Sequence, residues 1–272
     1  MSKRNSQQAK TAARERLRIE RERQAKRDKV RRQIKVAGSV VAALAIAGGI
    51  GYFVMQGNKP SQWEAAKDKP LVAPKNTTGK NNTTVTLGQD SAKKTIIAFE
   101  DPRCPICATF EQTVGPTVEK DLKDGKYKLQ YVGATFLDTN LPGEGSKNAL
   151  SALGAALNVS KDAFASYKEA LYSAKYHPEE TDDKFKDDAY LIEIADTVSE
   201  LKNNKTFQKD VKDGTFDRWA IEMSKNFDNN KYDVEGSPSF VTDGKKITGP
   251  DGKNAPMTVD DWNTAVDKAL KG

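Results

Sequence analysis

The chain has 272 residues, 30% charged and 37% hydrophobic, a length that fits one or two folded units. Its two cysteines exclude a small scaffold stapled by disulfides. The net charge of +6 does not describe the whole surface, because residues 1–35 contain 14 Lys and Arg against 4 Asp and Glu, and the remainder is mildly acidic. Since this basic arm lacks interleaved aromatic residues, we expect no nucleic-acid partner.

Residues 36–55 form an uncharged, largely apolar run that is long enough as a helix to cross a hydrocarbon core of about 30 Å. The run predicts a single transmembrane helix. Because the flanking cations lie on its N-terminal side, we expect the N-terminus in the cytoplasm and the rest of the chain outside. A cleaved signal peptide is the alternative, since Ala45-Ile46-Ala47 has the form of a cleavage site, but that site lies in the middle of the run. The pattern therefore favours a permanent anchor in the cell membrane.

Two polar segments flank the predicted span. Residues 1–35 combine strong helix formers with many cations, and we interpret them as a cytoplasmic arm at an anionic lipid surface. Residues 56–83 contain mostly Asn, Lys, Thr, Pro and Gly with few apolar groups. This composition predicts an extracytoplasmic linker.

From residue 84 onwards the pattern becomes that of a folded domain. Apolar runs at 85–87, 95–99 and 127–132 predict strands, the second of them buried on both faces. After the second run, helical spacing follows the cysteine pair, and Gly115-Pro116 predicts a kink in that helix. Cys104 and Cys107 therefore stand where a strand turns into a helix.

This position predicts redox chemistry. Pro105 suits the first turn of a helix, where its missing N–H is not needed. Cys104 then lies at the positive end of the helix dipole, which favours the thiolate and predicts a nucleophile. Arg103 adds a nearby cation, and Cys107, one turn further along the same face, is placed to act as the resolving thiol.

Two other interpretations of the pair are weaker. A structural zinc site needs four ligands, and besides the pair the chain offers a single histidine, His177, far along the sequence. A purely structural disulfide would close so short a loop that it would remove little entropy from the unfolded chain. We therefore expect a redox-active pair, with no metal and no other cofactor.

The segment FEDPRCPICATFEQ resembles the active site of the DsbA-like branch of the thioredoxin superfamily. A second segment, Gly236-Ser237-Pro238-Ser239-Phe240, resembles the loop of that family whose proline is cis and faces the cysteines. The resemblance implies that Pro238 is this cis proline and that Ser237 precedes it. It covers residues 84–272 and implies an α/β thioredoxin fold with an inserted helical domain.

The intervening and final segments agree with that order. Residues 145–230 have helical periodicity, which predicts the insertion, and their apolar stripes are expected to form core rather than a ligand site. Residues 239–242 and 246–248 predict a hairpin, and residues 258–270 a closing amphipathic helix.

The sequence departs from the family pattern at two positions. Six residues before the first cysteine, where the family commonly carries a buried acid thought to aid proton transfer, this chain has Ala98; Glu100 shares its strand face, displaced by two residues. Ile106 replaces a histidine that stabilises the thiolate in the best-known oxidases. These changes leave the direction of electron flow open.

Together these features predict a membrane-anchored thiol-disulfide oxidoreductase that forms disulfides in exported proteins and is recycled by a membrane redox partner. A reductase or isomerase of exported proteins is the rival within the same class. A tethered peptide-binding module with little turnover is the rival from another class. Opposing effects at Arg103 and Ile106 predict a moderately oxidising pair.

Overall fold

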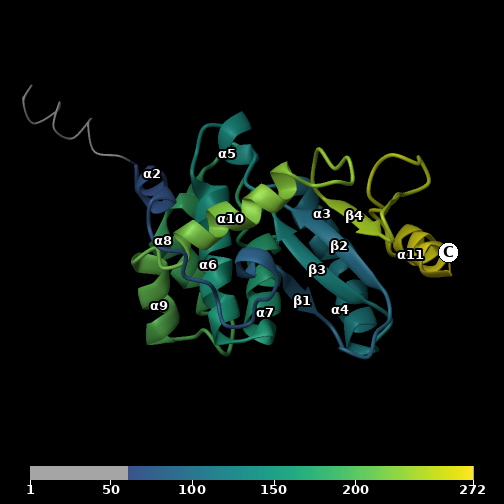
Figure 1. The fold of residues 1–272 in the computed structure, drawn as a ribbon, viewed down its shortest axis with the longest axis horizontal. Helices are drawn as coiled ribbons and strands as arrows, with labels where there is room; N and C mark the ends of the chain where they lie inside the picture. The colour runs from purple at the N-terminus through teal and green to yellow at the C-terminus, as the bar shows by residue number, and fades with distance from the viewer. Residues whose placement is uncertain (1–60, 272) are drawn as a thin grey trace, which may run out of the picture. The chain divides into compact units, whose positions relative to one another are not determined.

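A five-stranded mixed sheet is the centre of the structure, a computed structural model that describes residues 61–271 (Figure 1). The strand order is β1-β3-β2-β4-β5, with β2 and β3 parallel and every other neighbouring pair antiparallel. The strands are β1 (Val85–Leu87), β2 (Thr95–Glu100), β3 (Lys128–Gly133), β4 (Ser239–Thr242) and β5 (Lys245–Ile247). The predicted strands and the C-terminal hairpin are thereby confirmed.

Helices from both ends of the domain pack on one face of this sheet. The helix after the cysteines is interrupted as predicted: α3 (Pro105–Thr113) ends before Val114, and α4 (Gly115–Lys123) begins after it. The closing helix is α11 (Val259–Lys271). Its Trp262 ring packs on Phe110 of α3 and Phe240 of β4 at centroid distances of 5.2 and 4.8 Å, which joins α3, the sheet and α11 in one core.

Between β3 and β4 the chain forms a group of helices that Figure 1 shows beside the sheet, at the end of the molecule away from α11. We call this group the helical insertion. It consists of α5 (Leu137–Asn140), α6 (Gly145–Val159), α7 (Lys161–Tyr172), η2 (Lys184–Lys186), α8 (Asp188–Ala195), α9 (Lys205–Lys212) and α10 (Asp217–Asp228).

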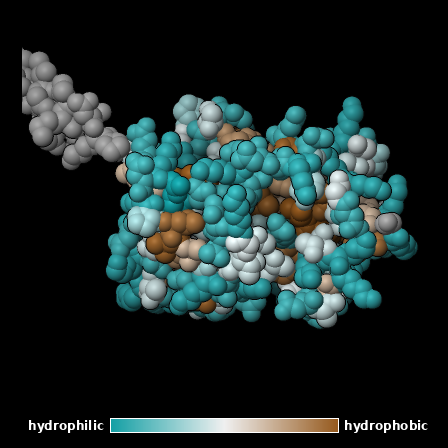
Figure 2. Space-filling view, in the orientation of Figure 1, coloured by the Kyte–Doolittle hydropathy of each residue, from teal (hydrophilic) through white to brown (hydrophobic). Residues whose placement is uncertain are grey.

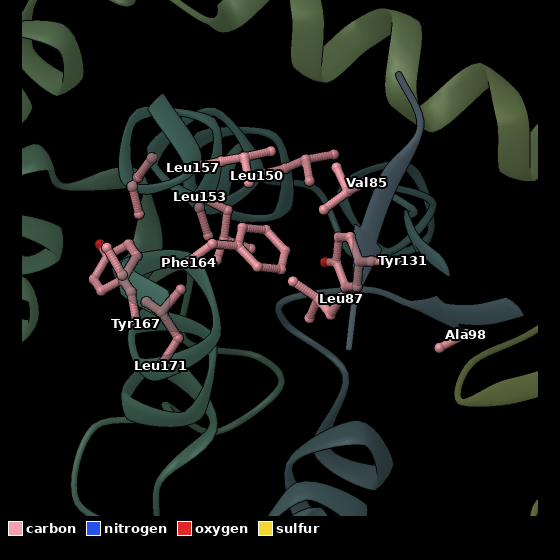
Figure 3. Close-up of a cluster of buried hydrophobic side chains, with 14 of the residues drawn as sticks. Val85, Leu87, Ala98, Tyr131, Leu150, Leu153, Leu157, Phe164, Tyr167 and Leu171 are labelled. Atoms are coloured by element: carbon pink, nitrogen blue, oxygen red, sulfur yellow. The ribbon is translucent and has the colours of Figure 1, made fainter. Parts of the chain in front are cut away.

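The insertion shares its core with the sheet. Figure 3 shows Leu150 of α6 and Phe164 of α7 facing Val85 and Tyr131 of the sheet. The Tyr131 ring meets Phe164 edge-on at 5.2 Å. At the end of β3, a Cβ on Gly133 would lie 2.3 Å from Leu150, so glycine lets α6 approach the strand. The apolar stripes of the insertion are confirmed as core.

The prediction of a linker over residues 56–83 is wrong for residues 61–83, which are part of the folded domain. Residues 61–83, which we call the strap, pack along the insertion and include α2 (Gln62–Lys67) and η1 (Lys80–Asn82). Trp63 is buried, Gln62 donates a hydrogen bond to Asp217 at 2.9 Å, and Trp219 donates to the Asn82 carbonyl at 2.8 Å. Composition concealed this packing because a single buried aromatic residue and a few hydrogen bonds with side chains of the insertion fix the segment.

The predicted span and the basic arm, residues 36–55 and 1–35, lie outside the described residues. Within residues 61–271, no helix has both the length and the apolar character that a membrane crossing requires.

Candidate active site

Cys104 lies at the junction between strand β2 and helix α3. It is the N-cap residue of α3, with Pro105 in the first turn, and its Sγ accepts a hydrogen bond from the Cys107 N–H at 3.4 Å. The Cys104 N–H in turn donates to the Asp101 carbonyl at 2.9 Å, which closes the turn after β2. The sulfur is thus placed among the N–H groups of the first helical turn, where a negative charge is favoured.

The two thiols lie in different electrostatic surroundings. Both are free and buried, with relative exposures of 5% for Cys104 and 2% for Cys107. A hydrogen bond from the Cys107 thiol, helped by N–H groups of the first turn, lowers the pKa of Cys104 to about 7 against the cost of burial. Burial, the neighbouring Cys104 and the charge of Glu100 raise the pKa of Cys107 well above its usual range. Near neutral pH, Cys104 therefore ionises while Cys107 keeps its proton.

The second sequence motif lies directly against the first. The Ser237–Pro238 peptide bond is cis, as the resemblance implied, and the Cys104 thiol donates to the Ser237 carbonyl at 3.3 Å. The strand that follows, β4, pairs with β2 through Ser239 opposite Phe99. Antiparallel pairing of β2 with β4 therefore brings together two motifs more than 130 residues apart in the chain.

The remaining residue of the dipeptide between the cysteines faces outward. Ile106 is 52% exposed, which makes it one of few large apolar side chains on the surface of the described residues. It offers an apolar contact beside the thiol but no hydrogen-bond donor. Ser237 contacts Cys104 through its carbonyl, and its buried hydroxyl has no hydrogen-bond partner within residues 61–271.

Arg103 does not have the role expected from its position in the sequence. Its side chain is 2% exposed, and Nη1 lies 3.0 Å from Asp138 and 3.4 Å from Asp183. Nη2 donates to the Glu180 carbonyl at 3.1 Å. Because two carboxylates bind the guanidinium, Arg103 anchors the turn before Cys104 to the insertion instead of pairing with the thiolate.

The comparisons with known proteins agree with this geometry. A family model described as Thioredoxin matches residues 80–268. The chain belongs to this thioredoxin family. A curated relative, disulfide bond formation protein D of Bacillus subtilis, is 27% identical over 188 residues, which cover 68% of this chain and 77% of the relative.

Solved structures of thioredoxin-family oxidoreductases share the fold. The crystal structure of oxidised BdbD from Bacillus subtilis has a TM-score of 0.55 at 23% identity, covering 74% of this chain and 99% of that one. Oxidised DsbA from Mycobacterium tuberculosis has a TM-score of 0.52 at 22% identity, covering 68% and 99%. With the family model and the curated relatives, this identifies the chain as a DsbA-like thiol-disulfide oxidoreductase.

This thioredoxin-family member holds buried charges behind Cys107 that the sequence analysis missed. Lys168 of α7 lies 3.2 Å from Glu100 and 2.6 Å from Glu111 of α3, and all three side chains are largely buried. Burial works to lower the pKa of Lys168, but the two carboxylates outweigh it and raise that pKa. Burial raises the pKa of Glu100, against the attraction of Lys168. We call these three residues the charge triad.

One signal in the sequence pointed to Lys168. It stands between Tyr167 and Leu171, at the i+4 position from Phe164, and so occupies the apolar stripe of a predicted helix. A cation in such a stripe needs a buried partner. Glu100, displaced by two residues from Ala98, is that partner.

Aromatic residues from the end of α7 complete the surroundings. Tyr172 packs with both cysteines and donates to the Asp101 carbonyl at 3.1 Å. The His177 ring stacks on Tyr172 at 5.8 Å, and its Nε2 lies 3.1 Å from the Pro102 carbonyl oxygen. Among residues 61–271, no group of three or more His, Cys, Asp or Glu side chains is placed to hold a metal ion.

Proposed function

We propose that this thiol-disulfide oxidoreductase forms disulfide bonds in exported proteins on the outer side of a bacterial cytoplasmic membrane. The observation that carries the proposal is the unequal thiol pair opposite a cis proline: the pKa of Cys104 is lowered to about 7, and that of Cys107 is raised. A thiol that ionises readily is both a good nucleophile and a good leaving group.

The reaction starts from the oxidised Cys104–Cys107 pair. A substrate thiolate attacks Sγ of Cys104, the bond to Cys107 breaks, and Cys107 leaves as a thiolate that takes up a proton. The second substrate thiolate then attacks the substrate sulfur of the mixed disulfide, and Cys104 leaves as a thiolate. The substrate is oxidised by two electrons and the enzyme is reduced by two, so the cycle requires a membrane redox partner that reoxidises the pair.

The loop before β4 supports binding of extended substrate segments. The Ser237 carbonyl stands 3.3 Å from the Cys104 sulfur, so a substrate chain that pairs with this backbone would bring its cysteine to Sγ. The exposed Ile106, in the dipeptide between the cysteines, offers a substrate an apolar contact. A peptide-binding module would use the same loop without needing the lowered pKa of Cys104, and this pKa favours the enzyme.

The location of the protein is proposed from the sequence. Residues 36–55 would anchor the chain, with the basic arm in the cytoplasm and the catalytic domain outside. Protease added to intact spheroplasts is expected to degrade the domain and spare the arm. Protection of the domain would contradict this topology, and a soluble domain released near residue 48 would mean that the span is a cleaved signal.

The reduction potential decides the redox direction. The pKa of Cys104, about 7, lies below that of an ordinary thiol, well above the value of about 3.5 in a strongly oxidising member of the superfamily, and near the value in reducing thioredoxin. This pKa is compatible with both directions, and the proposal that the enzyme forms disulfides predicts a reduction potential between about −120 and about −250 mV. Equilibration with glutathione measures it, and a potential below about −250 mV would favour the reductase or isomerase.

Trapping of substrates tests the proposed roles of the two thiols. Cys107→Ala is expected to accumulate mixed disulfides with exported proteins, because the thiol that would release them is absent. The matched control Cys104→Ala removes the nucleophile and should trap none. Equal trapping by both variants would overturn the assignment of Cys104 as the nucleophile.

A further inference from the structure

The strap is held firmly at several points along the insertion. Trp63 is buried at its start, the Lys67 carbonyl accepts a hydrogen bond from Arg218, and Asn76 Nδ2 donates to the Leu157 carbonyl at 2.7 Å. Near its end, Trp219 donates to the Asn82 carbonyl. One face of the strap is therefore fixed against the insertion, and the residues on its opposite face are held exposed to solvent.

That outward face combines exposed apolar residues with cations. Within residues 61–271 the exposed large hydrophobic residues are few, and two of them, Leu71 at 38% and Val72 at 45%, are neighbours in the strap. Exposed Lys67 and Lys69 precede them and exposed Lys75 follows. Figure 2 shows several apolar patches on the largely hydrophilic face in view, the broadest of them over the sheet. Apolar side chains flanked by lysines match the interface of a bilayer, where the chains enter the headgroup layer and the cations meet anionic lipid.

Chain length supplies the second argument, which rests on the membrane anchor proposed above. Because Gln62 already binds Asp217 of the insertion, only residues 56–61 separate the held part of the strap from the end of the predicted span. Even fully extended, these residues reach about 20 Å at ~3.5 Å each. The linker predicted from composition would have allowed a far longer reach. The body must therefore stay near the lipid surface at the end where the strap begins.

We propose that the outward face of the strap, from Lys67 to Lys75, rests on the anionic lipid surface of the membrane that holds the chain. The whole strap contains four lysines, including Lys80, and two acidic residues, Glu64 and Asp68, so it carries an excess of two positive charges. Since α2 and α11 lie at opposite ends of the body (Figure 1), the insertion would face the membrane and α11 would project away from it.

Tryptophan fluorescence in brominated lipid tests this contact in the full chain. The probe is Leu71→Trp, reconstituted into vesicles of brominated phosphatidylglycerol and compared with vesicles of the unbrominated lipid. The matched control is Val259→Trp, at a site 39% exposed at the start of α11. Bromine on the acyl chains should remove about half of the emission added at residue 71 and leave that added at residue 259 unchanged, because only the first enters the interface. The native tryptophans provide a common background.

Flotation of the same vesicles distinguishes failure of the membrane anchor from failure of the contact between strap and lipid. If the chain floats with the lipid and residue 71 is no more quenched than residue 259, the strap contact is wrong while the anchor stands. If the chain does not float, the anchor is wrong and the strap contact falls with it. Reversing the charges with Lys67→Glu and Lys69→Glu in the Leu71→Trp chain should lower quenching to the control level. Unchanged quenching would contradict the role of the lysines.

Discussion

The two sides of the cysteine pair are built from different regions by different means. On the thioredoxin side, backbone groups dominate: the N–H groups of α3 and the Ser237 carbonyl surround Cys104. On the side of the insertion, charged and aromatic side chains dominate: Lys168 binds Glu100, Tyr172 holds the Asp101 carbonyl, and Asp183 binds Arg103.

This difference separates the chemistry of the two thiols. Backbone groups, whose positions depend on the path of the chain, and the Cys107 thiol set the environment of Cys104, the thiol proposed to meet the substrate. Buried side-chain charges act on Cys107, the proposed resolving thiol. The inserted helices therefore do more than cover the sheet. Through Lys168 they supply the cation that pairs with Glu100, whose charge acts on Cys107.

The largest expected effect comes from removing the cation of the charge triad. Lys168→Met leaves Glu100 and Glu111 buried without a partner, and the free energy of unfolding should fall by about 3 to 5 kcal/mol. Urea denaturation of the reduced protein measures this loss. Since protonation would relieve the unpaired carboxylates, the loss should shrink as the pH falls.

The matched control is Lys161→Met, an exposed lysine on the same helix, which should change stability by no more than about 0.5 kcal/mol. Adding Glu100→Gln and Glu111→Gln to Lys168→Met should recover much of the loss, because no buried charge then remains. Similar stability of the Lys161 and Lys168 variants would mean that the triad does not hold the insertion to the core.

A smaller effect tests whether the strap belongs to the insertion. Trp63→Ala should destabilise the protein by about 2 to 3 kcal/mol, less than the ~3–5 kcal/mol of a central core tryptophan because the end of the chain can rearrange. Leu71→Ala, an exposed change in the same strap, should be nearly neutral. Thermal unfolding compares the two, and an equally neutral Trp63→Ala would restore the linker predicted from composition.

The difference between the thioredoxin side and the insertion side also explains which features could be predicted from the sequence. The strands and the kink at Gly115-Pro116 follow from local patterns, and the cis proline facing Cys104 follows from the family resemblance; the structure confirms them, with the helix interrupted at Val114. The partners of Arg103 and Lys168 lie about 35 to 80 residues away along the chain, so no local pattern specified them. The strap escaped prediction because Trp63 finds its apolar partners only in the folded insertion.

Titration of Cys104 gives the next effect. Because folding lowers its pKa from about 9 to about 7, the folded protein loses this proton at lower pH than the unfolded chain. Ionisation of Cys104 should therefore add about 2 kcal/mol to the free energy of unfolding of the reduced protein between pH 7 and pH 9, a gain that is lost as the pH falls through 7. The raised pKa of Cys107 subtracts a smaller amount near pH 9. Cys104→Ser should lack the rise. A rise that persists in the serine variant would assign it to other groups.

The smallest effect concerns the dipeptide on the thioredoxin side. Ile106→His places a donor beside Cys104 at a site already 52% exposed, so little packing is lost. One added hydrogen bond to a charged sulfur, worth about 1.5 kcal/mol, should raise the reduction potential by about 30 mV and lower the pKa of Cys104 further. Ile106→Leu should leave both unchanged. Glutathione equilibration and thiolate absorbance measure them, and if histidine behaves like leucine, the backbone donors of α3 already satisfy the thiolate and the dipeptide adds nothing to its charge.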